Sequence, residues 1–257
     1  MKYSMCADIM FVEIGKTGPI WPDTEGIIDA MKLARSNDLD GIEIFDLTDR
    51  DLEKIRKVSE ELGITIESCV SKGAVLLGDP EMTEELYSGF VETLQMAKEI
   101  NCSKIIFNAD NYARELSSDE VLEIMKSQLR KIVPTAEKNE ITILVEPLSG
   151  GFFTSSKQAF DLIRAVKSEN VKLLYDVFHF QNIEGNITNT IKENVDLIGD
   201  IHFAGSPMRG EITEGELNYS FILKQIKEYG YTGNICLEFF TFQNREEKVA
   251  VSAKLLV

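Results

Sequence analysis

Short apolar runs alternate with longer amphipathic stretches from one end of the chain to the other. The short runs are almost continuously apolar instead of alternating with polar positions. This pattern is typical of parallel strands that are covered on both faces. We therefore predict eight strands, at residues 3–9, 41–45, 64–70, 104–108, 141–146, 172–176, 197–204 and 234–239.

The stretches between these runs carry helical signals. Ser117 and Ser118 precede two acidic residues, which suits a helix cap and the positive end of a helix dipole. Leu62-Gly63 and Tyr229-Gly230 are typical helix exits. We predict helices at residues 24–37, 49–62, 83–100, 118–138, 155–168, 187–194, 219–229 and 245–256.

Eight strand–helix units within 257 residues predict an α/β fold. They favour a single (β/α)8 TIM barrel over an open doubly wound sheet. No G-x-G-x-x-G motif follows the first predicted strand, and the sequence contains no P-loop. The chain shows no linker or break in composition. We expect residues 1–257 to form one domain.

The net charge of −16, from 43 acidic and 27 basic residues, narrows the range of partners. Nucleic acids and anionic membranes reward clustered Lys and Arg, so neither is an expected partner. The sequence has no apolar run long enough for a membrane helix and no C-x-x-C pair among its four cysteines, and we expect no signal peptide. We expect a cytoplasmic protein with free thiols, and the sequence leaves homo-oligomer formation open.

Side chains that can bind a metal follow four consecutive predicted strands. They are Glu146, Asp176, His202 and Glu238. The other histidine of the chain, His179, lies three residues after Asp176. In a barrel, chemistry is located at the carboxyl ends of the strands. Taken singly, each of these residues has an ordinary structural explanation, such as a cap or a solvated acid. Together they predict a site that binds a divalent cation and moves protons.

Several motifs around these positions resemble hydroxypyruvate isomerases. Residues 175–191 resemble one motif of that family, and Arg209-Gly210-Glu211 followed by residues 215–219 resembles the next. Glu146-Pro147 and Glu238 match the remaining two. More broadly, the chain resembles the xylose isomerase-like superfamily, which includes the ketose 3-epimerases.

The resemblance implies a role for each position. One divalent metal ion would be bound by Glu146, Asp176, His202 and Glu238. Glu146 and Glu238 would also act as the acid and base. Contacts with the substrate would come from His179 and Arg209. We expect Glu43, at the end of the second predicted strand, to bind substrate as well, although pairing with a basic group is an alternative.

The chemistry is coherent without the resemblance. A cation chelated by a carbonyl and a hydroxyl oxygen stabilises the enediolate that forms when the neighbouring carbon loses its proton. Return of the proton to the adjacent carbon gives isomerisation, and return to the opposite face of the same carbon gives epimerisation. A mainly oxygen ligand set with one imidazole suits Mn²⁺ or Mg²⁺, ahead of Co²⁺ or Zn²⁺.

The substrate is less well determined than the reaction type. Ser68-Cys69 stands where relatives often carry a His, and Asp200 stands at another such position. Ser149 replaces an Asn of the relatives, and Gly205 replaces an Asp that they often carry. We expect a small sugar or hydroxy-oxo acid, without phosphate because no glycine-rich cradle is present. Trp21 and Phe11 fit either an apolar pocket wall or ordinary packing.

Three other functions remain as alternatives. A dehydratase would use the same base and metal to expel a hydroxyl group. A barrel that binds a metal or sugar without catalysis would tolerate the altered substrate positions. A nuclease of the endonuclease IV type needs a histidine-rich site and a basic surface, and two histidines with a net charge of −16 argue against it.

Overall fold

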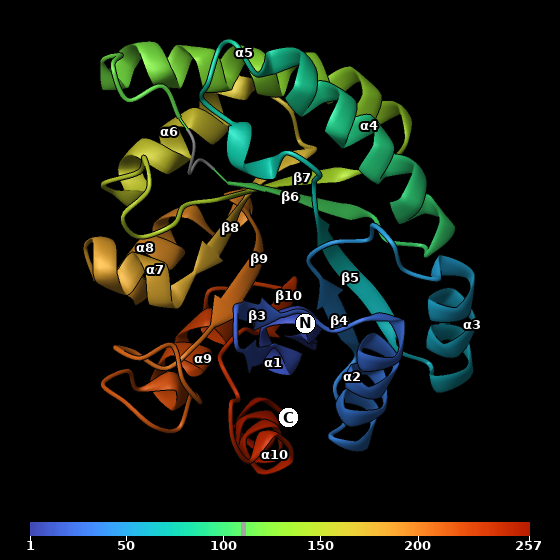
Figure 1. The fold of residues 1–257 in the computed structure, drawn as a ribbon. Coiled ribbons are helices and arrows are strands. Elements are labelled where there is room, and N and C mark those ends of the chain that lie inside the picture. Colours follow the sequence, from blue (N-terminus) through green and yellow to red (C-terminus); the bar gives the residue numbers. More distant parts are fainter. Residues whose placement is uncertain (109–111) are drawn as a thin grey trace.

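A computed structural model describes residues 1–108 and 112–257. Eight parallel strands form a closed barrel in which β1 pairs with both β4 and β10 (Figure 1). This confirms the predicted TIM barrel. The barrel strands are β1 (Lys2–Cys6), β4 (Gly41–Ile44), β5 (Thr65–Val70), β6 (Lys104–Asn108), β7 (Thr142–Glu146), β8 (Val171–Asp176), β9 (Ile198–Phe203) and β10 (Asn234–Leu237).

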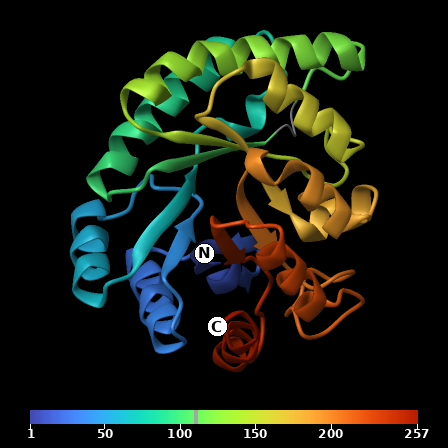
Figure 2. The ribbon, with the colours of Figure 1, turned by 180° about the vertical axis from the view of Figure 1, so that it is seen from behind.

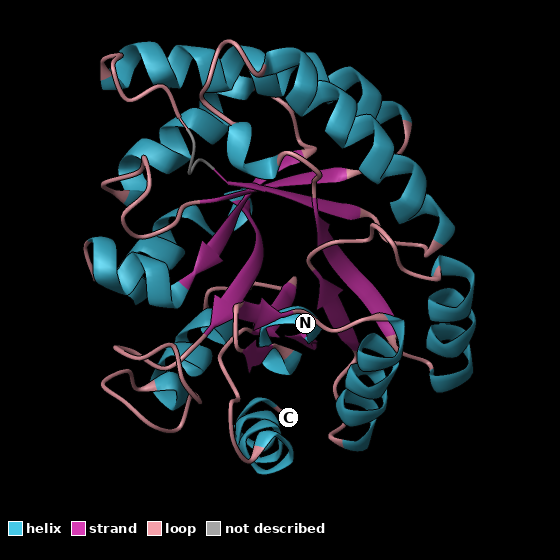
Figure 3. Cartoon of the chain, in the orientation of Figure 1, coloured by secondary structure: helices cyan, strands magenta, loops and turns pink. Residues whose placement is uncertain are grey.

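Helices surround the barrel and bury its outer face (Figures 2 and 3). Their ends follow local rules: a capping box at Ser117 begins α5, and Gly63, at a φ of +63°, ends α3 in the left-handed conformation. The helices of this layer are α2 (Thr24–Ser36), α3 (Leu52–Leu62), α4 (Thr83–Glu99), α5 (Ser118–Lys138), α6 (Ser156–Val166), α8 (Ile187–Asn194), α9 (Tyr219–Glu228) and α10 (Arg245–Leu256).

Short elements at the ends of the barrel strands differ from the prediction. The first strand ends at Cys6 and continues as α1 (Ala7–Phe11), so its predicted end at Ile9 was wrong. Periodicity cannot separate a short buried helix from a buried strand. The other unpredicted elements are β2 (Glu13–Gly15), β3 (Gly18–Ile20), α7 (Val177–Ile183) and the 3₁₀ turns η1 (Ala74–Leu76) and η2 (Val195–Leu197).

Inward-facing side chains are layered along the barrel axis. Near the amino ends of the strands, Lys104 pairs with Asp200 at 2.6 Å and with Glu67 at 3.6 Å. An apolar cluster lies above them, formed by Ile106, Leu144 and Leu174. Because side chains two residues apart on a strand share a face, Glu146 and Asp176 point inward directly above Leu144 and Leu174. The apolar layer thus forms the floor on which the carboxylates rest.

The cysteines are all buried and free, as predicted: Cys6, Cys69, Cys102 and Cys236. Among the described residues, no helix combines the length and the apolar composition that crossing a membrane requires.

Candidate metal centre

Four consecutive barrel strands bring the predicted ligands together. Glu146 ends β7, Asp176 ends β8, His202 lies in β9 directly beside Asp176, and Glu238 follows β10. All four residues are buried. One ligand atom from each lies within 4.8 Å of the others, which is the spacing of a shared metal ion.

His202 faces carboxylates with both ring nitrogens. Its Nδ1 lies 2.9 Å from Glu238 Oε2 and 3.7 Å from Glu146 Oε1. Its Nε2 lies 3.1 Å from Glu43 Oε2, and the Ser68 hydroxyl donates to the same carboxylate oxygen at 2.5 Å. The ring is therefore oriented with Nδ1 toward the predicted ligand set and Nε2 toward a buried carboxylate on the other side.

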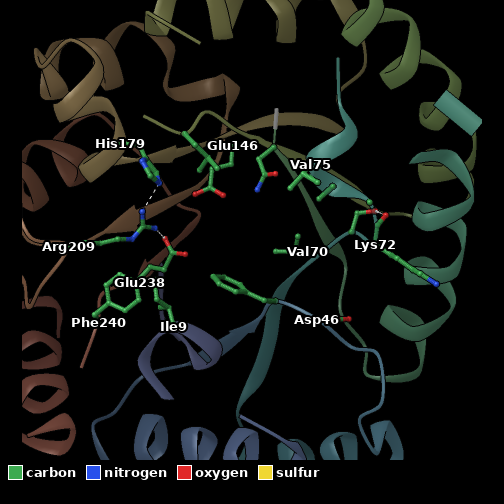
Figure 4. A pocket seen from close by; sticks show the side chains of 16 residues that line it. Ile9, Asp46, Val70, Lys72, Val75, Glu146, His179, Arg209, Glu238 and Phe240 are labelled. Atoms are coloured by element: carbon green, nitrogen blue, oxygen red, sulfur yellow. Dashed lines mark hydrogen bonds and ion pairs between the residues drawn. The ribbon is translucent and has the colours of Figure 1, made fainter. Parts of the chain in front are cut away.

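Arg209 connects the predicted substrate contacts to the carboxylates. Its Nη2 donates to Asp176 Oδ2 at 3.2 Å and to Glu238 Oε2, and its Nη1 lies 2.6 Å from His179 Nε2 (Figure 4). The backbone N–H of Ser149 donates to His179 Nδ1 at 3.1 Å. The structure thus places His179 and Arg209 together at one side of the site.

Burial and the charges of the site shift the pKa values of Glu146 and Glu238 in opposite directions. Burial and the nearby Glu238 carboxylate raise the pKa of Glu146 well above its usual range. Burial would also raise the pKa of Glu238, but the charges of Arg209 and His202 outweigh it and hold that pKa well below its usual range. Two neighbouring carboxyl groups with opposite pKa shifts are typical of acid–base catalysis.

Cys6 and Cys236 border the same cluster on the side of Glu43. A cysteine binds metal as the thiolate. Burial, followed by the charge of Glu43, raises the pKa of both thiols well above the usual value. The oxygen and imidazole set around Glu146 is therefore the better metal site.

A cavity of about 640 Å³ opens above the carboxylates (Figure 4). Glu146, Glu238, His179 and Arg209 line it, and their roles in proton transfer and substrate binding remain predictions. Asp176 and His202 are buried and do not belong to its described lining. Glu43 is fully buried and does not belong to the described lining residues, so substrate binding by Glu43 remains a prediction.

The structure decides between the two roles left open for Trp21 and Phe11, a wall of this cavity or ordinary packing. Neither Trp21 nor Phe11 belongs to its lining; the Trp21 ring packs near Phe45, and Phe11 packs beneath the Arg245 guanidinium. Most of the apolar lining was not predicted from the sequence. Its members lie at or shortly after the ends of barrel strands, in α1 or in η1. They are Ile9, Phe45, Val70, Ala74, Val75, Leu148 and Phe240.

Comparison with known proteins identifies the family from the sequence and supports the fold from the shape. A family model for the xylose isomerase-like TIM barrel matches residues 31–257. The hydroxypyruvate isomerase of Escherichia coli is 29% identical over 212 residues, which cover 77% of this chain and 82% of that relative. The 2-oxo-tetronate isomerase of Pectobacterium atrosepticum is 28% identical over 165 residues, which cover 62% of this chain and 63% of that relative.

Solved structures share the architecture at lower identity. The D-allulose 3-epimerase from Methylomonas sp., in complex with D-allulose, superposes with a TM-score of 0.83 at 16% identity, covering 100% of this chain and 96% of that one. Identity at this level supports the fold alone.

Proposed function

The chain belongs to the xylose isomerase-like TIM-barrel family, and from this we propose that it is a divalent-metal-dependent isomerase or epimerase of a small sugar or hydroxy-oxo acid. One observation carries the proposal. Four buried side chains able to bind a metal converge at the carboxyl ends of four strands, with an arginine and a histidine beside them. That combination suits a substrate with vicinal carbonyl and hydroxyl oxygens.

The donor set fits a divalent cation. Glu146 Oε1 is buried and has no hydrogen-bond partner in the described part of the chain. An orphaned carboxylate oxygen in a protein interior is costly, and a cation would satisfy it. Glu146, Asp176, His202 and Glu238 would hold Mn²⁺ or Mg²⁺, with Co²⁺ or Zn²⁺ as less suited alternatives. The cation would supply positive charge to the substrate oxygens.

Glu146 and Glu238 are the proposed proton carriers. Both line the cavity and come from strands on either side of β8 and β9. A cation beside Glu146 would lower the pKa of this carboxyl group, so that either glutamate could be ionised and accept a proton from carbon. The other glutamate must enter the step protonated, and it would then return its proton to the neighbouring carbon or to the opposite face of the same one.

Arg209 and His179 are the proposed substrate contacts. The planar guanidinium suits a carboxylate or a pair of hydroxyl groups, and its contact with His179 fixes both side chains on one side of the cavity. A substrate held there would present its reacting carbons to the two glutamates. Glu43 is the third predicted contact, but its bonds to His202 and Ser68 favour positioning of the metal ligand instead.

Turnover with a substrate panel tests the proposal. The purified protein, loaded with Mn²⁺ or Mg²⁺, would be incubated with hydroxypyruvate, tartronate semialdehyde and common ketoses, and the products identified by NMR and mass. We expect products of unchanged mass, and loss of activity in both Glu146→Gln and Glu238→Gln. Glu67→Gln, at the opposite end of the barrel, is the matched control and should remain active. Full activity in either site variant contradicts the two-carboxylate assignment, and loss of water identifies a dehydratase.

A further inference from the structure

The two sides of the cavity have different chemistry. Glu146, Glu238, His179 and Arg209 lie together on one side (Figure 4). The opposite side is formed by the ends of β4 and β5 and by η1, where Phe45, Val70 and Val75 line the space. We call this opposite side, together with Ala74, the apolar wall. Ile9 and Phe240 are also apolar but lie beside Glu238 and Arg209 (Figure 4), and Leu148 follows β7.

Three polar residues of the described lining lie next to the apolar wall, and each already has a partner. The ammonium group of Lys72 points away from the cavity and pairs with Glu92 on α4 (Figure 4). The Ser71 hydroxyl donates to the backbone carbonyl of Lys72 at 3.2 Å, and the Asp46 carboxylate accepts from the Thr48 backbone at 2.8 Å. Ser71 and Asp46 can each still accept a hydrogen bond, but among the described residues the side chains of Phe45, Val70 and Val75 offer none. A substrate hydroxyl placed against these three side chains would lose its water without a partner there.

One polar atom between the two sides is free to bind substrate. Asn108 ends β6 and lines the cavity, and its buried Oδ1 has no hydrogen-bond partner among the residues that the structure describes. A buried amide oxygen of this kind requires a donor. A single hydroxyl group on the substrate, beyond the reacting carbons, would supply it.

The cavity is larger than a three-carbon substrate requires. A volume of about 640 Å³ lies within the range of roughly 300–1,000 Å³ that is usual for pockets of drug-sized ligands. A three-carbon acid such as hydroxypyruvate would occupy a small part of it and would leave the apolar wall uncovered. A longer substrate would reach that wall.

We propose that the substrate is an α-hydroxycarbonyl compound whose far end is a hydrocarbon group. Arg209 and His179 hold the polar end, Asn108 accepts one hydroxyl, and the alkyl or aryl end covers Phe45, Val70 and Val75. The inference rests on the proposed function and narrows its substrate class. The inference predicts that the enzyme selects against substrates whose carbon chain carries hydroxyl groups up to its last carbon.

A matched pair of six-carbon acids tests the inference. 3,4-Dihydroxy-2-oxohexanoate and 3,4,5,6-tetrahydroxy-2-oxohexanoate differ only in two terminal hydroxyl groups. Metal-dependent exchange of the C3 proton with D₂O would be followed by NMR for both. We expect kcat/KM to be roughly 10- to 100-fold higher for the first, mainly through KM, because small differences in an apolar pocket give discrimination of this size.

A variant of the apolar wall completes the test. Val75→Thr places a hydroxyl group in the wall and should reduce the preference several-fold, whereas the same change at exposed Val251 on α10 should leave it unaltered. Equal or faster exchange of the tetrahydroxy acid overturns the inference while supporting the proposed function. No metal-dependent exchange of either acid, nor of hydroxypyruvate and the ketoses, overturns the proposed function and the inference with it.

Discussion

Replacing Glu43 with glutamine should weaken metal binding without removing any predicted metal ligand. Glu43 Oε2 lies 3.1 Å from His202 Nε2, and neither side chain is exposed enough for water to take over the contact. A carboxylate in this position fixes the ring orientation and increases the basicity of the nitrogen that faces the metal. The glutamine keeps the shape of the side chain but loses its charge.

The expected loss in affinity is 10- to 100-fold, which is usual for partners that orient a metal-binding histidine. It corresponds to about 1.4–2.8 kcal/mol of binding free energy. Ser68→Ala provides a graded comparison, because it removes one hydrogen bond to Glu43 and leaves the carboxylate in place. Its effect should be smaller than that of Glu43→Gln.

Calorimetric titration of metal-free protein with Mn²⁺ gives the dissociation constants directly, and thermal unfolding checks that both variants are folded. An affinity of folded Glu43→Gln within two-fold of the wild-type value would refute the positioning role. A raised KM with unchanged Mn²⁺ affinity would instead support the role in substrate binding that the sequence predicts for Glu43.

Three further predictions concern stability and are measured by urea unfolding. Burial raises the pKa of Glu67, but hydrogen bonds from Lys2 and Thr65 outweigh it and lower the pKa. The stabilisation is present above the unfolded pKa and lost as pH falls through the folded one, so Glu67→Gln should be destabilising at pH 7 and progressively less so as Glu67 becomes protonated; an effect that does not change on acidification contradicts the linkage. Ser117→Ala should cost about 1 kcal/mol by opening the capping box of α5. Leu174→Ala should cost about 2–5 kcal/mol by leaving a cavity in the floor of the site; under 1 kcal/mol would refute that packing.

Much of the barrel was predictable because its signals are local. A strand buried on both faces is a nearly continuous apolar run, and all eight runs became barrel strands. The carboxyl ends of parallel strands meet at one end of a barrel, so acids at those ends could be placed together before any coordinates were known. Glu146, Asp176 and Glu238 follow this rule.

Features that depend on contacts between distant segments were not predictable. The run that contains Ile9 is apolar whether it forms a strand or a helix, and only its packing decides. Asp200 lies two residues before His202 yet pairs with Lys104, 96 positions away, near the amino ends of the strands. The contact of Glu43 with His202 spans 159 positions and has no signature in either segment.

Deuterium incorporation is the measurement that tests the central claim most directly. The Mn²⁺-loaded protein would be incubated in D₂O with hydroxypyruvate, tartronate semialdehyde, erythrulose, fructose, tagatose, psicose and 3,4-dihydroxy-2-oxohexanoate, and followed by NMR. The proposed mechanism predicts label on a carbon next to a carbonyl group, dependent on the metal and absent in Glu146→Gln and Glu238→Gln. Label that appears equally without metal, or no label on any compound while Mn²⁺ is demonstrably bound, would contradict it.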